Sequence, residues 1–172
     1  MPLIGKEKTL IIACEEYGLN KFIEFNDRIF IYSPSRNMLQ PYNHLERGII
    51  QYYIESKGCK QLVFAGAVQQ DIIDGIFQDD SVQSLHAKLT FNLGLFLKNR
   101  NNLVITTPLR DQLLTELHVI AQCNILMDYY FIREQVKNRQ LQIRGVVAEM
   151  HEEQFKPIFY NGIIHNTIIS MN

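Results

Sequence analysis

The sequence predicts an α/β fold with a mainly parallel central sheet, and two kinds of pattern support that prediction. Short apolar runs at 9–14 and 61–66 each end in a polar turn, which is typical of buried parallel strands. Longer segments at 43–57 and 81–98 repeat their apolar residues at helical spacing. Because strand-like and helix-like segments alternate along the chain, helices are expected to flank the sheet.

The elements follow one another without a linker or internal repeat. Strands are expected at 9–14, 29–32, 62–65, 103–106 and 141–148, and helices at 43–57 and 81–98. A third helical region opens at Thr107-Pro108, a good helix start, and its length predicts a break near His118–Val119. The run 157–160 follows a polar stretch and predicts a C-terminal antiparallel hairpin, with Pro157 at an edge or at a strand start.

Composition restricts the class of protein. The 172 residues fit a single domain over 1–172, and 47% hydrophobic with 20% charged residues is ordinary for a globular protein. A net charge of −1 argues against nucleic acid as a partner, and no apolar stretch approaches the ~20 residues that span a bilayer. Three widely spaced cysteines and no signal-peptide core point to reduced thiols and a cytoplasmic location.

Two strand ends are the expected site of any chemistry. The first run ends at Cys14 and is followed by Glu15-Glu16-Tyr17-Gly18, and the second is followed by Ala67-Val68-Gln69-Gln70-Asp71. In open α/β sheets, ligands bind in the crevice beyond the carboxyl ends of the strands. The two loops together offer one thiol, three carboxylates and two amides, but no histidine.

Several segments, in order and at compatible spacing, resemble the β-class carbonic anhydrases over about residues 9–155. They are 27–32 with Asn37 and Pro41, then 50–54 followed by 58–66, and finally 119–147 with its Leu-Gln-Ile-Arg-Gly-Val-Val strand. The resemblance implies that family's fold, with a C-terminal antiparallel edge strand or hairpin. It also implies a homodimer or a multiple of dimers, for which the tyrosines at 52–53 and 129–130 are suitable interface residues.

The resemblance also implies that the family's zinc site is degenerate here. The family holds zinc with the Cys of Cys-x-Asp-x-Arg and with both ends of His-x-x-Cys. The matching positions are Cys14, Glu16 and Gly18 in the first motif, and Ala67 and Gln70 in the second. A catalytic zinc needs three protein ligands and an open position. We therefore expect no cofactor, and zinc only if ligands come from outside these motifs.

These losses favour a non-catalytic module that binds a small ligand or regulates a partner. Its ligand would be a small anion or polar metabolite, held by Gln69, Gln70, Asp71 and Arg36. One alternative is an enzyme of altered chemistry, with Cys14 as nucleophile or Glu16 and Asp71 around another cation. Another is residual zinc-dependent hydration of carbon dioxide with recruited ligands, for which a histidine is a candidate.

Each candidate residue also has a structural interpretation. Cys14 is a suitable buried packing residue, and the carboxylates at 15 and 16 suit the first turn of a helix. Asp71 is a suitable helix cap, and Arg36 suits an exposed turn. The histidines form no common cluster, because His118 and Cys123 lie five residues apart and so on different helix faces.

Overall fold

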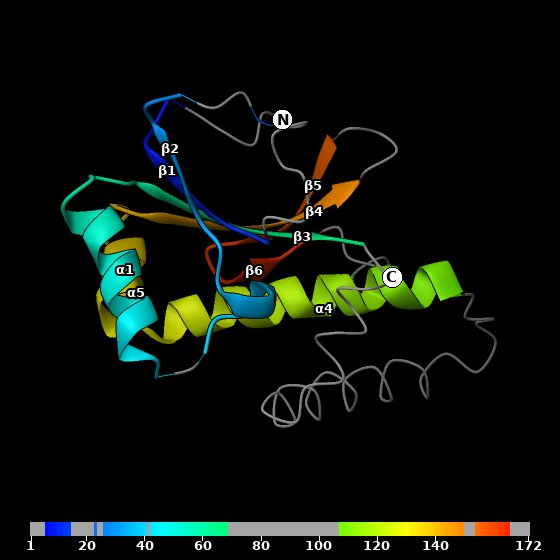
Figure 1. Cartoon of the computed structure of the whole chain (residues 1–172). Helices are drawn as coiled ribbons and strands as arrows, with labels where there is room; N and C mark the ends of the chain where they lie inside the picture. The colour runs from blue at the N-terminus through cyan, green and yellow to red at the C-terminus, as the bar shows by residue number, and fades with distance from the viewer. Residues whose placement is uncertain are drawn as a thin grey trace.

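The computed structural model describes residues 6–14, 23, 26–40, 42–68, 107–149 and 154–165 (Figure 1). The expected strand at 103–106 and the expected helix at 81–98 lie outside these residues. The elements, in chain order, are β1 (Thr9–Ile12), β2 (Ile29–Tyr32), the 3₁₀ helix η3 (Ser35–Asn37), α1 (His44–Glu55), β3 (Gln61–Ala67), α4 (Thr107–Asp128), α5 (Tyr130–Lys137), β4 (Gln142–Glu149), β5 (Gln154–Tyr160) and β6 (Ile163–Ile164). None of these helices is long and apolar enough to cross a membrane.

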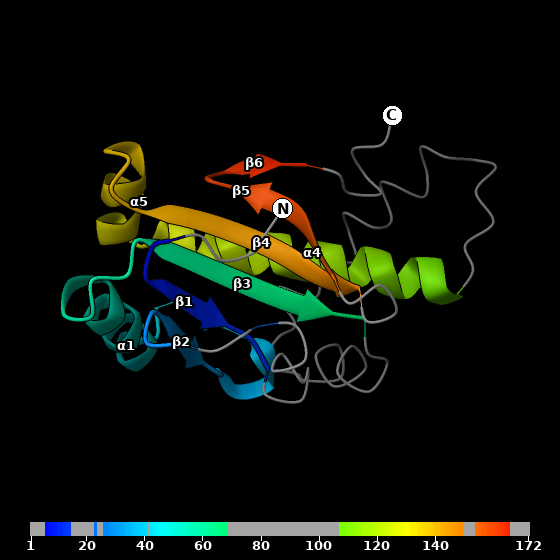
Figure 2. The same cartoon turned by 90° about the horizontal axis from the view of Figure 1, so that it is seen from above.

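The strands form one six-stranded sheet in the order β2-β1-β3-β4-β5-β6 (Figure 2). The first four in that order pair in parallel, and β5 and β6 are added antiparallel at the C-terminal edge. The predicted α/β class and the predicted C-terminal hairpin are therefore confirmed. Strand β6 was not expected, because its two residues are too short to show an alternating pattern.

The sheet is buried on both faces at its centre. Every residue of β1 and of β3 is buried. Side chains alternate between two separate apolar clusters, so that Leu10 and Ile12 belong to one and Ile11 and Ala13 to the other. This explains why these strands are continuous apolar runs rather than alternating ones.

Helix α1 begins and ends where local chemistry predicts. The Asn43 side chain caps its first turn, with Oδ1 accepting from the backbone N–H of Leu45 at 3.0 Å and of Glu46 at 3.3 Å. Past the C-terminus, Gly58 adopts a left-handed φ of 74° that stops the helix. The chain then turns into β3, the strand that leads toward the candidate site.

Helix α4 is continuous, so the predicted break near His118–Val119 is wrong. Both residues are buried, and packing against the sheet keeps the helix intact through this stretch. A Cβ on Gly66 of β3 would lie 2.6 Å from Val119 Cγ2, which shows how closely the helix approaches the sheet. The break occurs instead at Tyr129, whose extended ψ of 116° separates α4 from α5.

Pro157 was expected at a strand start or an edge strand. It lies within β5 and pairs with Val146 of β4 on one side. On the other side, β6 pairs with Phe159 and Tyr160 and does not reach Pro157, so β5 is the edge of the described sheet at the proline, as expected. The register of the β4–β5 pair shifts between Gly145 and Val146. This irregularity interrupts the hydrogen-bond ladder next to the proline, so its missing N–H is tolerated in the strand interior.

Candidate functional site

The two predicted strand ends lie at the same edge of the sheet. Strands β1 and β3 are parallel neighbours whose register pairs Ile12 with Phe64, and both point to that edge (Figure 2). Cys14 follows β1 there, and Ala67 is the last residue of β3. The structure thus brings together the two positions that sequence reasoning paired.

Cys14 and Ala67 belong to one apolar environment. Ala67 is 1% exposed, and Cys14 is partly buried and packs against the cluster that contains Ala13, Ala65 and Ala67. An alanine methyl group donates no electron pair. Of these two strand-end residues, Cys14 alone carries a group that can bind a metal or attack an electrophile.

The remaining predicted site residues are only partly placed. Glu16, Gly18, Gln69, Gln70 and Asp71 lie outside the described residues. Arg36 has a described backbone within η3, but its side chain lies outside the description. Whether these groups converge with Cys14 therefore stays a prediction.

Asn37 holds helix η3 against the end of β3. In the sequence, this residue was noted only as part of the family resemblance. Asn37 is fully buried and has a left-handed φ of 51°. Its Nδ2 donates to the Ala65 carbonyl oxygen at 3.2 Å. This contact places the backbone of η3 beside the end of β3.

Two polar side chains of α4 contact the backbone of the segment 37–39, which follows β2. His118 Nε2 lies 2.9 Å from the Asn37 carbonyl oxygen, and Gln122 Oε1 accepts from the Leu39 backbone N–H at 2.7 Å. They are four residues apart and face the loop together. Sequence reasoning missed this pair, although two buried polar residues at i, i+4 on a largely apolar helix were a usable signal.

The contact with Asn37 determines the state of His118. Burial lowers the pKa of His118 to about 4, against a smaller opposite effect of the hydrogen bond to Asn37. The ring is therefore neutral at pH 7. Because a carbonyl oxygen only accepts, Nε2 must carry the hydrogen, and Nδ1 has no partner within the described residues.

The donor groups that the structure describes at this edge do not by themselves make a catalytic zinc site. Cys14 offers one sulfur and Ala67 offers nothing, whereas the metal needs three protein ligands. His118 is engaged by Asn37, and burial raises the pKa of the Cys123 thiol, which opposes the thiolate form. Within the described ranges, no group of three His, Cys, Asp or Glu side chains is arranged to hold a metal ion.

Solved structures with a similar fold are carbonic anhydrases of the β class. A mutant of the β-carbonic anhydrase CafD of Aspergillus fumigatus has a TM-score of 0.75 at 21% identity, covering 91% of this chain and 92% of that one. Tetrameric β-carbonic anhydrases of Sordaria macrospora include a chain with a TM-score of 0.70 at 18% identity, covering 88% and 80%. The Coccomyxa enzyme in complex with acetazolamide has a TM-score of 0.66 at 14% identity, covering 91% and 74%.

These similarities concern the fold rather than individual residues. No protein-family model and no curated protein matches the sequence. The order of strands, the C-terminal hairpin and the coverage of the solved structures agree with the resemblance seen in the sequence. The chain has the fold of the β-carbonic anhydrases.

Proposed function

We propose that the protein is a pseudoenzyme: a non-catalytic binding or regulatory module on the β-carbonic-anhydrase fold that does not hydrate carbon dioxide with zinc. The observation that carries this proposal is Ala67. It ends β3 at the position that matches the family's histidine ligand, and it is almost completely buried. Cys14 is then left as a single zinc ligand where three are needed.

The crevice beyond β1 and β3 is the proposed binding site. Its ligand is a small anion or polar metabolite, which suits the amides of Gln69 and Gln70 and the charges of Arg36 and Asp71. The backbone of η3, clamped to β3 through Asn37, supports the inclusion of Arg36. This part of the proposal rests on the position of the loops that follow β1, β2 and β3, at the carboxyl ends of parallel strands.

Metal analysis together with a hydration assay tests the catalytic part. Protein purified without chelator is expected to contain far less than one zinc per chain. Its rate of carbon dioxide hydration, followed by stopped flow, is expected to equal that of buffer. Near-stoichiometric zinc with a chelator-sensitive rate above buffer would refute the proposal.

Restoring the lost ligands provides a matched control. The double variant Ala67→His, Gln70→Cys supplies the imidazole and the second thiol that the family pattern requires. It is expected to bind zinc, and the further change Cys14→Ser is expected to weaken that binding. If the double variant binds no more zinc than the wild type, the assignment of Ala67 and Gln70 to the ligand positions is wrong.

The proposal also includes self-association of the chain and a location in the cytoplasm. The Sordaria neighbours are described as tetrameric, which supports a homodimer or larger assembly of this chain. None of the three cysteines forms a disulfide, which suits the reducing cytoplasm. We include both in the proposed function.

A further inference from the structure

The starts of the four parallel strands form an edge of the sheet that lies opposite the strand-end crevice. In Figure 2, β1, β2, β3 and β4 all begin on the left, beside α1 and α5. Backbone hydrogen bonds join these starts. The N–H of Lys60 donates to the Lys8 carbonyl at 2.9 Å, and that of Thr9 to the Arg28 carbonyl at 2.8 Å. Four segments that are far apart in the sequence therefore meet at this edge, namely 6–8, 27–28, 55–60 and 137–141.

These four segments, which we call the basic edge, carry far more positive than negative charge. Their charged side chains are all exposed and comprise seven basic and three acidic residues: Lys6, Lys8, Arg28, Lys57, Lys60, Lys137 and Arg139 with Glu7, Asp27 and Glu55. The edge thus has an excess of four positive charges, although the whole chain has a net charge of −1. The rest of the chain therefore carries an excess of five negative charges, and the charge is distributed unevenly.

Three of the cations form a row across neighbouring strands. Arg28, Lys8 and Lys60 each come directly before the first residue that pairs in β2, β1 and β3. Neighbouring strands lie about 4.8 Å apart, so the register brings these like charges close together. Like charges at opposite positions of adjacent strands are unfavourable. An anionic partner above the row would remove that repulsion.

The charge of the row is not neutralised from within the described part of the chain. None of the seven cations makes an ion pair with a described residue. Lys8 Nζ donates to the Lys57 carbonyl oxygen at 3.0 Å, and Arg28 Nη1 to the Lys6 carbonyl oxygen at 3.3 Å. These carbonyl groups orient the two cations and leave their full charge. A helix dipole explains cations near the ends of α1 and α5, but not Arg28 before β2.

The residue types of the basic edge favour an acidic protein segment as its partner. None of the exposed large apolar side chains in the described residues belongs to this edge, so it lacks groups that insert into a membrane. The three carboxylates among its cations would repel the continuous phosphate backbone of a nucleic acid. A peptide can instead place its carboxylates against individual cations and leave the carboxylates of the edge uncovered.

We propose that the basic edge is a docking surface for an acidic segment of another protein. The row of Arg28, Lys8 and Lys60 receives carboxylates at its centre. Lys137 and Arg139, which precede β4, extend the surface beside Lys60. The contact is electrostatic, so it depends strongly on salt. The basic edge and the crevice lie at opposite ends of the parallel strands, so this proposal and its test are independent of the proposed function.

Fluorescence anisotropy of a labelled deca-glutamate peptide, titrated with the full chain, tests the class of partner. The peptide is expected to bind at about 20 mM salt and about tenfold more weakly at about 300 mM, because salt screens exposed charges. A glycine–serine peptide of the same length should not bind. An oligothymidylate with the same number of charges and phosphatidylserine vesicles should both bind more weakly than deca-glutamate. Equal or tighter binding of either probe, or no binding of deca-glutamate at the lower salt, would refute the assignment.

Charge variants locate the contact on the protein. The double variant Arg28→Gln, Lys60→Gln removes two cations of the row and should weaken deca-glutamate binding about fivefold, since it loses two exposed ion pairs. The variant Arg47→Gln, Arg110→Gln changes the net charge by the same amount away from the edge.

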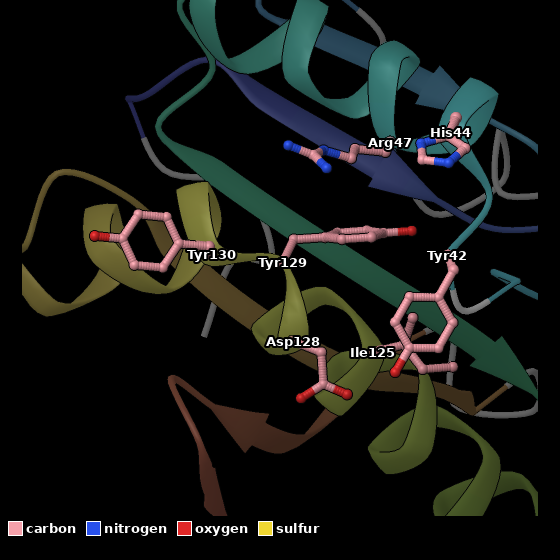
Figure 3. Close-up of a pocket in the computed structure, with 7 residues that line it drawn as sticks. All are labelled: Tyr42, His44, Arg47, Ile125, Asp128, Tyr129 and Tyr130. Atoms are coloured by element: carbon pink, nitrogen blue, oxygen red, sulfur yellow. The ribbon is translucent and has the colours of Figure 1, made fainter.

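Both positions of this control lie at other parts of the fold. Arg47 lines a cavity of about 280 Å³ beside the start of α1, together with Asp128 and Tyr130 among other residues (Figure 3). Arg110 lies in the first turn of α4. The control should bind deca-glutamate within about twofold of the wild type, because it keeps all the cations of the basic edge. Equal weakening by the two double variants would show a response to net charge alone and would overturn the proposal.

Discussion

The three cysteines of this chain lie in different environments, which give their thiols different reactivity. Cys14 is partly buried at the sheet edge, whereas Cys59 and Cys123 are fully buried. Burial raises the pKa of Cys59 to about 11 and also raises that of Cys123. The reactive thiolate form is therefore suppressed at both buried positions near neutral pH.

Alkylation of the native protein is expected to modify Cys14 alone. With iodoacetamide at pH 7.5, mass spectrometry should find one adduct, and its peptide should contain Cys14. The variant Cys14→Ser should take up none, whereas urea-unfolded protein should take up three. Native-state adducts on Cys59 or Cys123 would contradict the burial described for them.

A second single-residue effect is the pH dependence that His118 gives to folding. Its folded pKa of about 4 is below the usual 6.5, so between these values the unfolded chain binds a proton that the folded chain does not. Stability should therefore fall as the pH falls from about 6.5 to about 4, by about 2 kcal/mol between pH 7 and pH 5.

Urea unfolding of wild type and His118→Gln at pH 7 and pH 5 measures this effect. The glutamine can still donate to the Asn37 carbonyl, but it does not titrate. Its loss of stability between the two pH values should be smaller than that of the wild type by about 2 kcal/mol. Equal losses in both proteins would show that His118 is not the group responsible.

At the scale of elements, close contact between α4 and the sheet positions the candidate site. Gly66 in β3 and Gly145 in β4 have no side chain, and this lets Val119 of the helix pack directly against the backbone of the sheet. The same helix holds the loop after β2 through His118 and Gln122. One helix therefore determines both the separation of the layers and the place of the loop beside the crevice.

Gly145→Ala is expected to destabilise the protein by about 1–3 kcal/mol, the usual cost of overpacking a core. The added methyl carbon would lie 2.8 Å from Val119 Cγ1 and 2.9 Å from both Cys123 Sγ and Phe159 Cβ. Gly48→Ala is the matched control, because nothing lies within 4 Å of its Cβ on α1. It should stabilise the helix by about 0.5–1 kcal/mol. Denaturant midpoints that move equally for both variants would contradict the close contact.

The molecule as a whole presents exposed apolar groups on more than one surface. Tyr52 on α1 is 48% exposed, and Ile163 on the edge strand β6 is 58% exposed. An edge strand with apolar side chains is a typical site of pairing between chains. Both surfaces are candidates for the self-association that we propose.

Sedimentation analysis at micromolar concentration is expected to find a dimer or a larger assembly. Tyr52→Glu should shift the distribution toward monomer, because a charge would be buried at the aromatic interface that the sequence predicts. Ile163→Lys serves as the comparison at the sheet edge. A wild-type protein that sediments as a monomer at every concentration would refute the proposed homodimer.

Much of this architecture was predictable because its signals are local. Continuous apolar runs predicted β1 and β3, and apolar residues at helical spacing predicted α1. The prediction failed where distant packing outweighs local preference. Helix α4 continues through 118–119 because both residues are buried against the sheet.

The sequence by itself determined the α/β class and the two strand ends, since these depend only on residue type and order. The proposed loss of zinc ligands at Ala67 and Gln70 rests on the resemblance seen in the sequence. Only the tertiary structure decided that His118 contacts Asn37, 81 residues away, and that Arg47 and Asp128 line one cavity. Such contacts join residues far apart in the chain, so no local pattern contains them. They exist because α4 packs against the sheet and meets α5 at Tyr129, beside the start of α1.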